Sequence, residues 1–229
     1  MALPIQAHPA GARGAVAPCR PAIHIVDDDA AVRRAITRLL SLEDWEVYAY
    51  DSAEAFLAQP AVDRPGCVIL DVALPGQDGV ALQLVMAERG VHLPVIFLTG
   101  HADVPLTVNA MKQGALDFLV KPVDVTVLLA AVNRALQKDE RLRAQRARRE
   151  ATDSRLASLT PREREVLMHV MEGRLNKQIA ADLGTAEKTV KVHRARGMEK
   201  MHVRSVAELV RAVERAHPHE DDEEGGAAA

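Results

Sequence analysis

The chain has 229 residues, of which 48% are hydrophobic and 27% are charged, a composition typical of globular proteins with one or two domains. No apolar stretch approaches the roughly 20 residues that a membrane-spanning helix needs, and two cysteines are too few for a disulfide framework. These features exclude an integral membrane protein and a disulfide-rich secreted domain, and they favour a reducing, cytoplasmic compartment.

The net charge of −3 hides a strong asymmetry along the chain. Residues 1–137 carry a net charge of −5, residues 138–155 of +3, residues 156–217 of +4, and residues 218–229 of −5. This order predicts a domain for metal or phosphate chemistry, followed by a domain that binds a polyanion. Charge alone does not distinguish this interpretation from an ordinary solvated surface.

Residues 1–21 are rich in Ala, Pro and Gly and lack the apolar core of a signal peptide, so we expect a disordered arm. From Ala22, short apolar runs alternate with amphipathic stretches. Strands are expected at Ala22–Val26, Glu46–Tyr50, Cys67–Leu70, Val95–Leu98 and Leu116–Val120. Helices are expected at Ala30–Leu42, Ala53–Ala58, Val80–Arg89, Val104–Gln113 and Val125–Leu136. This alternation predicts an α/β domain over residues 22–137, with a doubly wound, five-stranded parallel sheet covered on both faces.

Residues 138–158 form a charged linker with almost no apolar side chains. It either continues the preceding helix as an exposed rod, which we favour, or is flexible. The segment after it is all-helical in character. Thr160-Pro161-Arg162-Glu163 is a capping box with Pro at the first helical position. Further helices are expected at Lys177–Leu183, at about Ala186–Met201 and at Ser205–Arg215. We therefore predict a four-helix domain over residues 159–216, with a helix-turn-helix at about 176–195. We expect residues 217–229 to form an acidic, disordered tail.

Polar residues follow four of the predicted strands. Asp27 and Asp28 follow the first strand, Asp71 the third, Thr99 the fourth and Lys121 the fifth. The carboxyl ends of parallel strands share one edge of the sheet, where sites are built. Crowded carboxylates need a cation, and an oxygen-only ligand set selects a hard ion such as Mg²⁺. An Asp beside that ion can attack phosphorus as a nucleophile, while a hydroxyl and an ammonium stabilise charge on the phosphoryl oxygens.

Each of these features also has an ordinary explanation. A strand-end Asp is more often a helix or turn cap than a nucleophile, acidic residues favour the start of any helix, and Lys-Pro is a common turn. The combination of all four features in one α/β unit favours the functional interpretation.

Residues 22–137 resemble the receiver domain of two-component response regulators, through Asp27-Asp28, Asp71 with Pro75 and Gly79, Thr99 and Lys121-Pro122. The resemblance implies the CheY-like fold. It also implies that Asp71 accepts a phosphoryl group from a sensor histidine kinase. Mg²⁺ would be bound by Asp28, Asp71 and the backbone carbonyl of Ala73, with Asp27 acting through water. Further roles follow from the same resemblance: Thr99 and Phe118 as the switch pair, Lys121 as the contact to the phosphoryl group, and a cis Lys121-Pro122 peptide.

Residues 176–196, with Leu159–Leu167 upstream, resemble the LuxR/FixJ helix-turn-helix, so the chain from 22 to 215 resembles a FixJ/NarL-type regulator. In such a domain Lys191, Val192 and Ala195 would face base edges in the major groove. The side chains expected at DNA phosphates are Lys177, Thr189, His193, Arg196 and Lys200. Arg194 is expected on a solvated face. Ala186 stands where the family usually has a capping Ser, and Thr185 is a candidate substitute.

The sequence therefore predicts a transcription regulator, and no enzyme beyond its own phosphoryl transfer and autodephosphorylation. Phosphorylation of Asp71 would promote a homodimer that binds promoter DNA and contacts RNA polymerase, without membrane contact. Two alternatives stay open. A haloacid-dehalogenase-type phosphatase also uses a strand-end Asp, but it needs a second acid two residues on, where this chain has Ala73. A phosphorylation-independent DNA-binding regulator would use the receiver only for dimerisation.

Overall fold

The computed structural model describes residues 20–58, 64–76, 78–100 and 114–217. The helix expected at Val104–Gln113, nearly all of the N-terminal arm and the acidic tail beyond residue 217 lie outside these ranges. The chain divides into two units, Met1–Glu140 and Arg141–Ala229. No helix in the described ranges is both long enough and apolar enough to cross a bilayer.

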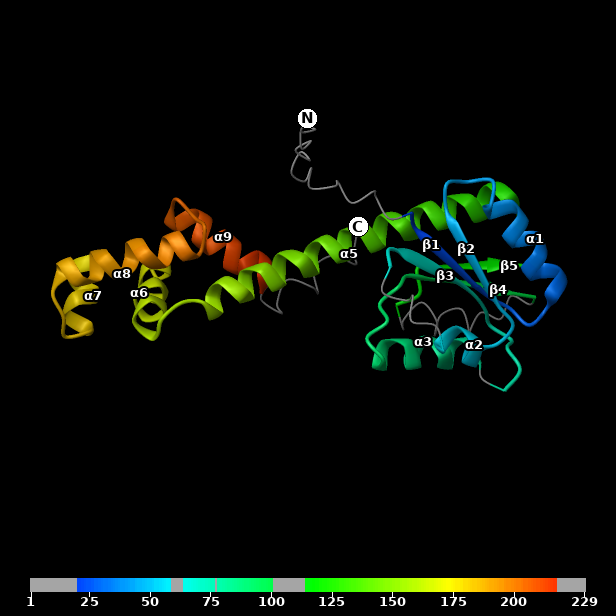
Figure 1. Ribbon diagram of the computed structural model, residues 1–229, viewed down its shortest axis with the longest axis horizontal. Coiled ribbons are helices and arrows are strands. Elements are labelled where there is room, and N and C mark those ends of the chain that lie inside the picture. Colours follow the sequence, from blue (N-terminus) through cyan, green and yellow to red (C-terminus); the bar gives the residue numbers. More distant parts are fainter. Residues whose placement is uncertain (1–19, 59–63, 77, 101–113, 218–229) are drawn as a thin grey trace, which may run out of the picture. The chain divides into compact units, whose positions relative to one another are not determined.

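The first unit is built on a parallel sheet whose strand order is β2-β1-β3-β4-β5 (Figure 1). The strands are β1 (Ala22–Val26), β2 (Glu46–Tyr50), β3 (Gly66–Asp71), β4 (Val95–Thr99) and β5 (Asp117–Val120). All four neighbouring pairs are parallel, which confirms the doubly wound α/β prediction. Because Val26 of β1 pairs with Leu70 of β3, the residues that follow them, Asp27 and Asp71, lie side by side.

Helices cover both faces of the sheet. Figure 1 shows α2 (Ala53–Leu57) and α3 (Gly79–Glu88) on one face, opposite α1 (Ala30–Leu40) and the start of α5 (Val125–Ala157). Alternate strand residues point to opposite faces, so Ile69 packs with the α1 and α5 side, whereas Val68 and Leu70 pack with the α2 and α3 side. A strand with both faces covered is apolar throughout, which explains the continuous apolar runs in the sequence.

The amino end of β3 is tied to α5 by a buried carboxylate. Asp139 on α5 is only 2% exposed, and its Oδ2 accepts a hydrogen bond of 2.9 Å from the backbone N–H of Gly66. Gly66 must be glycine, because a Cβ there would lie 1.9 Å from the backbone oxygen of Ala22. The strand that carries Asp71 at one end is thus anchored to a helix at the other.

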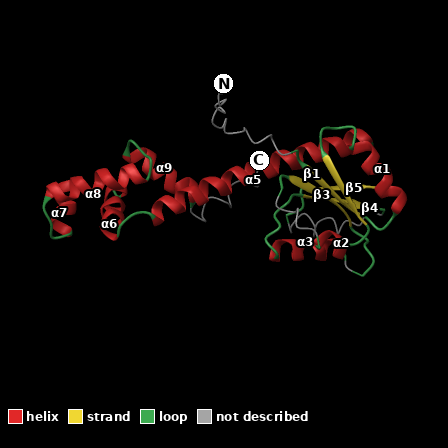
Figure 2. Cartoon of the chain, viewed as in Figure 1, coloured by secondary structure: helices red, strands yellow, loops and turns green. Residues whose placement is uncertain are grey.

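The described part of the second unit is helical (Figure 2). After the end of α5 come α6 (Pro161–Met171), α7 (Asn176–Asp182), α8 (Glu187–Lys200) and α9 (Val206–Ala216). Its apolar core consists of two clusters, centred on Val166, Val170, Ile179 and Val190, and on Leu167, Met201 and Leu209. The predicted capping box is present, since Thr160 Oγ1 accepts from Glu163 N and Glu163 Oε2 accepts from Thr160 N. Residues 138–157 are helical as part of α5, so the linker continues the preceding helix.

Candidate functional site

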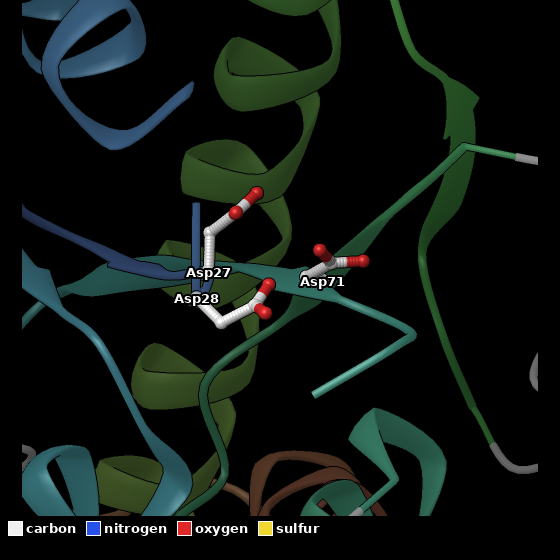
Figure 3. A group of neighbouring side chains, drawn as sticks. All are labelled: Asp27, Asp28 and Asp71. Atoms are coloured by element: carbon white, nitrogen blue, oxygen red, sulfur yellow. The ribbon is translucent and has the colours of Figure 1, made fainter. Parts of the chain in front are cut away.

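Three carboxylates meet at the carboxyl ends of β1 and β3 (Figure 3). One oxygen from each of Asp27, Asp28 and Asp71 lies within 4.8 Å of the others. Asp27 is fully buried and Asp71 is 5% exposed, whereas Asp28 is open to solvent. The sheet order causes this convergence, because β1 and β3 are neighbours although their carboxyl ends, Val26 and Asp71, are far apart along the chain.

The three consecutive aspartates after β1 have separate roles. Asp29 is the N-cap of α1, and its Oδ1 accepts from the backbone N–H groups of Ala31 at 2.7 Å and Val32 at 3.4 Å. Asp27 turns inward, and its Oδ1 accepts from the N–H of Asp29 at 2.9 Å. Asp29 therefore acts as a helix cap, whereas Asp27 and Asp28 belong to the acidic pocket.

Lys121 bridges the two buried acids. Its Nζ lies 2.6 Å from Asp27 Oδ2 and 2.7 Å from Asp71 Oδ2. Burial opposes the charged form of Lys121, but its hydrogen bonds to the two carboxylates outweigh this effect and raise its pKa. Burial raises the pKa of Asp27 despite the opposing hydrogen bond from Lys121. Three carboxylates thus share one ammonium in the described part of the pocket.

The remaining receiver residues lie at the same edge of the sheet. Thr99 is the last residue of β4 and is buried, and its backbone oxygen accepts from Lys121 N at 2.7 Å. Phe118 on β5 is partly buried, with its ring centroid 6.2 Å from that of Phe97. Ala73 is exposed, and its N–H donates to Asp71 Oδ1 at 3.1 Å. The Lys121-Pro122 peptide bond is cis.

Two contacts around the pocket did not follow from sequence reasoning. Arg33 on α1 donates from a guanidinium nitrogen to the backbone oxygen of Asp27 at 2.6 Å. Gly79 lies so close to β3 that a Cβ there would meet the backbone oxygen of Asp71 at 2.3 Å. For Arg33 the sequence signal is a basic residue one turn into α1. For Gly79 it is a glycine directly after the α3 N-cap Asp78, which is also part of the receiver resemblance.

The donor set fits a hard divalent cation. All the clustered ligand atoms are carboxylate oxygens, and one carboxylate is open to solvent, as suits Mg²⁺, which retains part of its water shell. The excess negative charge left by Lys121 gives a cation an electrostatic reason to bind there.

The second unit presents a basic helix. On α8 the side chains of Lys191, Val192 and Ala195 are exposed on one face. The Lys191 ammonium lies 2.8 Å from Glu187 Oε1, one turn earlier, and this hydrogen bond lowers the pKa of Glu187. This face can therefore offer a cation together with apolar groups to a partner.

The residues predicted at phosphates are not equivalent. Lys177, Thr189 and Arg196 are exposed and His193 is partly buried. Lys200 is held within the unit, since its Nζ lies 2.7 Å from Glu163 Oε2 and donates to the backbone oxygen of Ser158 at 3.1 Å. Lys200 thus has a structural role, which competes with the predicted contact to DNA.

Two details of the helix-turn-helix correct the sequence analysis. Arg194 does not lie on a purely solvated face, because it is partly buried and donates to Asn176 Oδ1 on α7 at 3.0 Å. Thr185 does not replace the missing capping serine: Ala186 is the N-cap of α8, and in the described structure no side chain caps this helix. The basic helix is thus fastened to its neighbours through its polar side chains as well as through its core.

Comparison with known proteins connects the two units to families. Residues 23–133 match the response regulator receiver domain, and residues 157–213 match the luxR family of bacterial regulatory proteins. Nodulation protein W of Bradyrhizobium diazoefficiens is 43% identical over 192 residues, which cover 84% of this chain and 85% of that protein. The transcriptional regulatory protein FixJ of Azorhizobium caulinodans is 45% identical over 190 residues, 82% of this chain and 90% of that protein.

The chain belongs to the two-component transcriptional response regulators. This response regulator is also similar to solved structures. The response regulator StyR matches 86% of this chain and 100% of its own, with a TM-score of 0.78 and 41% identity. Full-length FixJ from B. japonicum matches 86% of this chain and 97% of its own, with a TM-score of 0.53 and 41% identity.

Family membership confirms the general prediction: a receiver is joined to a DNA-binding output domain, and the protein is not a classical enzyme. It implies a partner kinase and DNA binding for this response regulator. It also makes the phosphatase alternative untenable. The individual roles of the residues in the pocket and on α8 stay predictions.

Proposed function

We propose that Asp71 of this response regulator is the residue that accepts a phosphoryl group from a sensor histidine kinase. One observation carries the proposal: the Asp71 carboxylate ends β3 beside Asp27 and Asp28, with the Lys121 ammonium 2.7 Å from its Oδ2. The Asp71 side chain is 5% exposed, so the pocket shields it from most solvent while the carboxylate still reaches the pocket edge. Asp27 is fully buried, and Asp28 lacks a cation at this distance in the described structure, so Asp71 is the best candidate nucleophile.

In the transfer, a carboxylate oxygen of Asp71 attacks the phosphorus of the kinase phosphohistidine. The P–N bond breaks as the new P–O bond forms, and the imidazole leaves. The Lys121 ammonium, which lies next to Asp71 Oδ2, would then stabilise the negative charge on the phosphoryl oxygens. Asp28, Asp71 and the Ala73 carbonyl would hold Mg²⁺, with Asp27 acting through water. The ion would neutralise charge that Lys121 alone leaves in excess.

The output is expected to begin on the neighbouring strands. Thr99 ends β4 beside the pocket, and Phe118 lies on β5, where it pairs with Phe97. Both side chains would rearrange when a phosphoryl group occupies the pocket. This change would favour a homodimer that binds promoter DNA through α8 and contacts RNA polymerase, in the cytoplasm. On α8, Lys191, Val192 and Ala195 would contact base edges. Lys177, Thr189, His193, Arg196 and Lys200 would contact phosphates.

The phosphoacceptor is tested by intact-mass measurement after incubation with a small phosphodonor and Mg²⁺. The wild type should gain one acid-labile phosphoryl group, and Asp71→Asn none. Asp51→Asn is the matched control, because Asp51 is exposed and lies outside the acidic cluster. Equal labelling of Asp71→Asn and wild type would contradict the assignment.

The link to DNA is tested by light scattering and by fluorescence anisotropy with a labelled duplex. The phosphodonor should raise both the mass of the complex and its DNA affinity. DNA binding that does not change with phosphodonor, in a protein labelled at Asp71, would support the phosphorylation-independent alternative.

A further inference from the structure

A small hollow at the junction of α6, the α7–α8 turn and α8 is lined mainly by hydrogen-bond donors. Its rim carries the guanidinium of Arg162, the hydroxyls of Thr185 and Thr189 and the imidazole of His193. Apolar side chains, including Val166 and Leu183, form the remaining wall. No acidic side chain of the described residues lines it, so its character suits an anion.

The donors are available for a ligand. In the described structure no hydrogen-bond partner is found for the hydroxyls of Thr185 and Thr189 or for the His193 ring. Among the described residues, Arg162 pairs with Glu165 at 2.8 Å; Glu165 does not line the hollow, and both side chains of the pair are about half exposed. An exposed pair of this kind contributes little free energy, so an anion of higher charge can replace Glu165 as the partner of Arg162.

The backbone around the hollow favours the same ligand. Gly184 and Thr185 lead directly into α8, whose N-cap Ala186 offers no side-chain hydrogen bond. The first amides of a helix attract negative charge, and here no side chain of the described residues satisfies them. The uncapped start of α8 thus borders the same hollow as the side-chain donors of Arg162, Thr189 and His193, so backbone and side-chain donors can serve one acceptor.

From this arrangement we propose that the hollow binds one phosphate of the DNA backbone, with Arg162 and Thr185 as contacts in addition to Thr189 and His193. The inference rests on the proposed DNA binding by α8 and extends it to α6, which lies outside the helix-turn-helix. Donors from three segments on one phosphate would set the position of α8 along the groove without reading sequence. Arg162 suits this role because its planar fork can donate two parallel hydrogen bonds to a phosphate.

The test uses the full-length protein, phosphodonor and Mg²⁺, with a fluorescein-labelled random-sequence duplex as the probe. Arg162→Ala should weaken binding about tenfold at low salt, as expected for the loss of a charged hydrogen bond. It should also reduce the slope of log K against log salt by about one. Arg211→Ala on α9 is the matched control, because it removes the same charge from an exposed residue away from the hollow. Its affinity should stay within twofold of the wild type.

A double-mutant cycle tests whether the donors share one phosphate. If Arg162 and Thr185 hold the same group, Arg162→Ala combined with Thr185→Ala should lose less affinity than the product of the single losses. Multiplicative losses, or equal affinities and salt slopes for Arg162→Ala and wild type, would overturn the proposal. A wild-type protein that binds no duplex would instead contradict the proposed function. Circular dichroism of each variant confirms folding, and Arg162→Lys should restore part of the affinity if charge at this position matters.

Discussion

The hydrogen bond between Asp139 and Gly66 predicts a large loss of stability from one substitution on α5. Asp139→Ala removes the acceptor 2.9 Å from the Gly66 N–H, and both residues are buried, so water cannot replace it without opening the structure. An unpaired buried N–H costs about 1–3 kcal/mol, and truncating the buried side chain adds to this loss. We expect the free energy of unfolding of the first unit to fall by about 2–3 kcal/mol.

The measurement is urea unfolding of the full chain, followed by Trp45 fluorescence. Trp45 is the single tryptophan and packs against the α1 and α5 side of the sheet core, so its signal reports the first unit selectively. With a slope of about 1–3 kcal/mol per molar urea, the midpoint should fall by roughly 1 M or more at unchanged slope. Asp139→Asn keeps a side-chain oxygen that can accept from Gly66 and should lose less than half as much.

The exposed neighbour Glu140 supplies the control, since Glu140→Ala should change the free energy of unfolding by no more than about 0.5 kcal/mol. If Asp139→Ala unfolds at the same urea concentration as Glu140→Ala, another hydrogen-bond acceptor satisfies the Gly66 N–H. The reasoning about this anchor would then be wrong.

Three further predictions concern the pocket and the second unit. Lys121→Ala removes the ammonium 2.7 Å from Asp71, so the initial rate of phosphoryl incorporation, followed by intact mass, should fall about 100-fold. Gly79→Ala places a Cβ 2.3 Å from the backbone oxygen of Asp71, so Trp fluorescence should show a loss of about 1–3 kcal/mol in unfolding free energy, with slower labelling. A hydrogen bond from Lys200 holds the pKa of Glu163 at about 2, below its ordinary 4.5. Its stabilising effect is therefore complete above pH 4.5 and lost as the pH falls towards 2, and Glu163→Gln should remove this part of the pH dependence of thermal unfolding measured by circular dichroism.

The sheet was predictable because its three central strands, β1, β3 and β4, are buried on both faces. Apart from His24 on β1, the central runs predicted as strands are apolar, and the expected strand at Val95–Leu98 differs from β4 only by the added Thr99. The strand ends were less certain: β3 extends over Gly66 and Asp71 because parallel pairing continues into those residues. A local pattern of hydrophobicity cannot report where pairing stops.

The extent of α5 was left open by the sequence for a different reason. The predicted helix ended at Leu136 because the apolar periodicity ends there, but the structure continues it to Ala157. Residues 137–157 contain neither Gly nor Pro and are rich in Arg and Ala, which have high helix propensity. Propensity sustains the helix after its apolar stripe has ended. The anchor at Asp139 was unpredictable, since its partner Gly66 is 73 residues away.

The basic residues of α8 show where reasoning from residue type fails. Sequence reasoning treated Arg194 as solvated and Lys200 as a DNA contact, yet their charged groups bond to Asn176 and to Glu163. These bonds fix the middle of α8 to α7 and its last residue to the start of α6. Positive charge on this helix therefore serves two purposes. Arg196 is exposed, and Lys191 is exposed although it pairs with Glu187, so both can meet a phosphate or a base. Arg194 and Lys200 help to orient those cations, because their own contacts fasten α8 to α7 and α6.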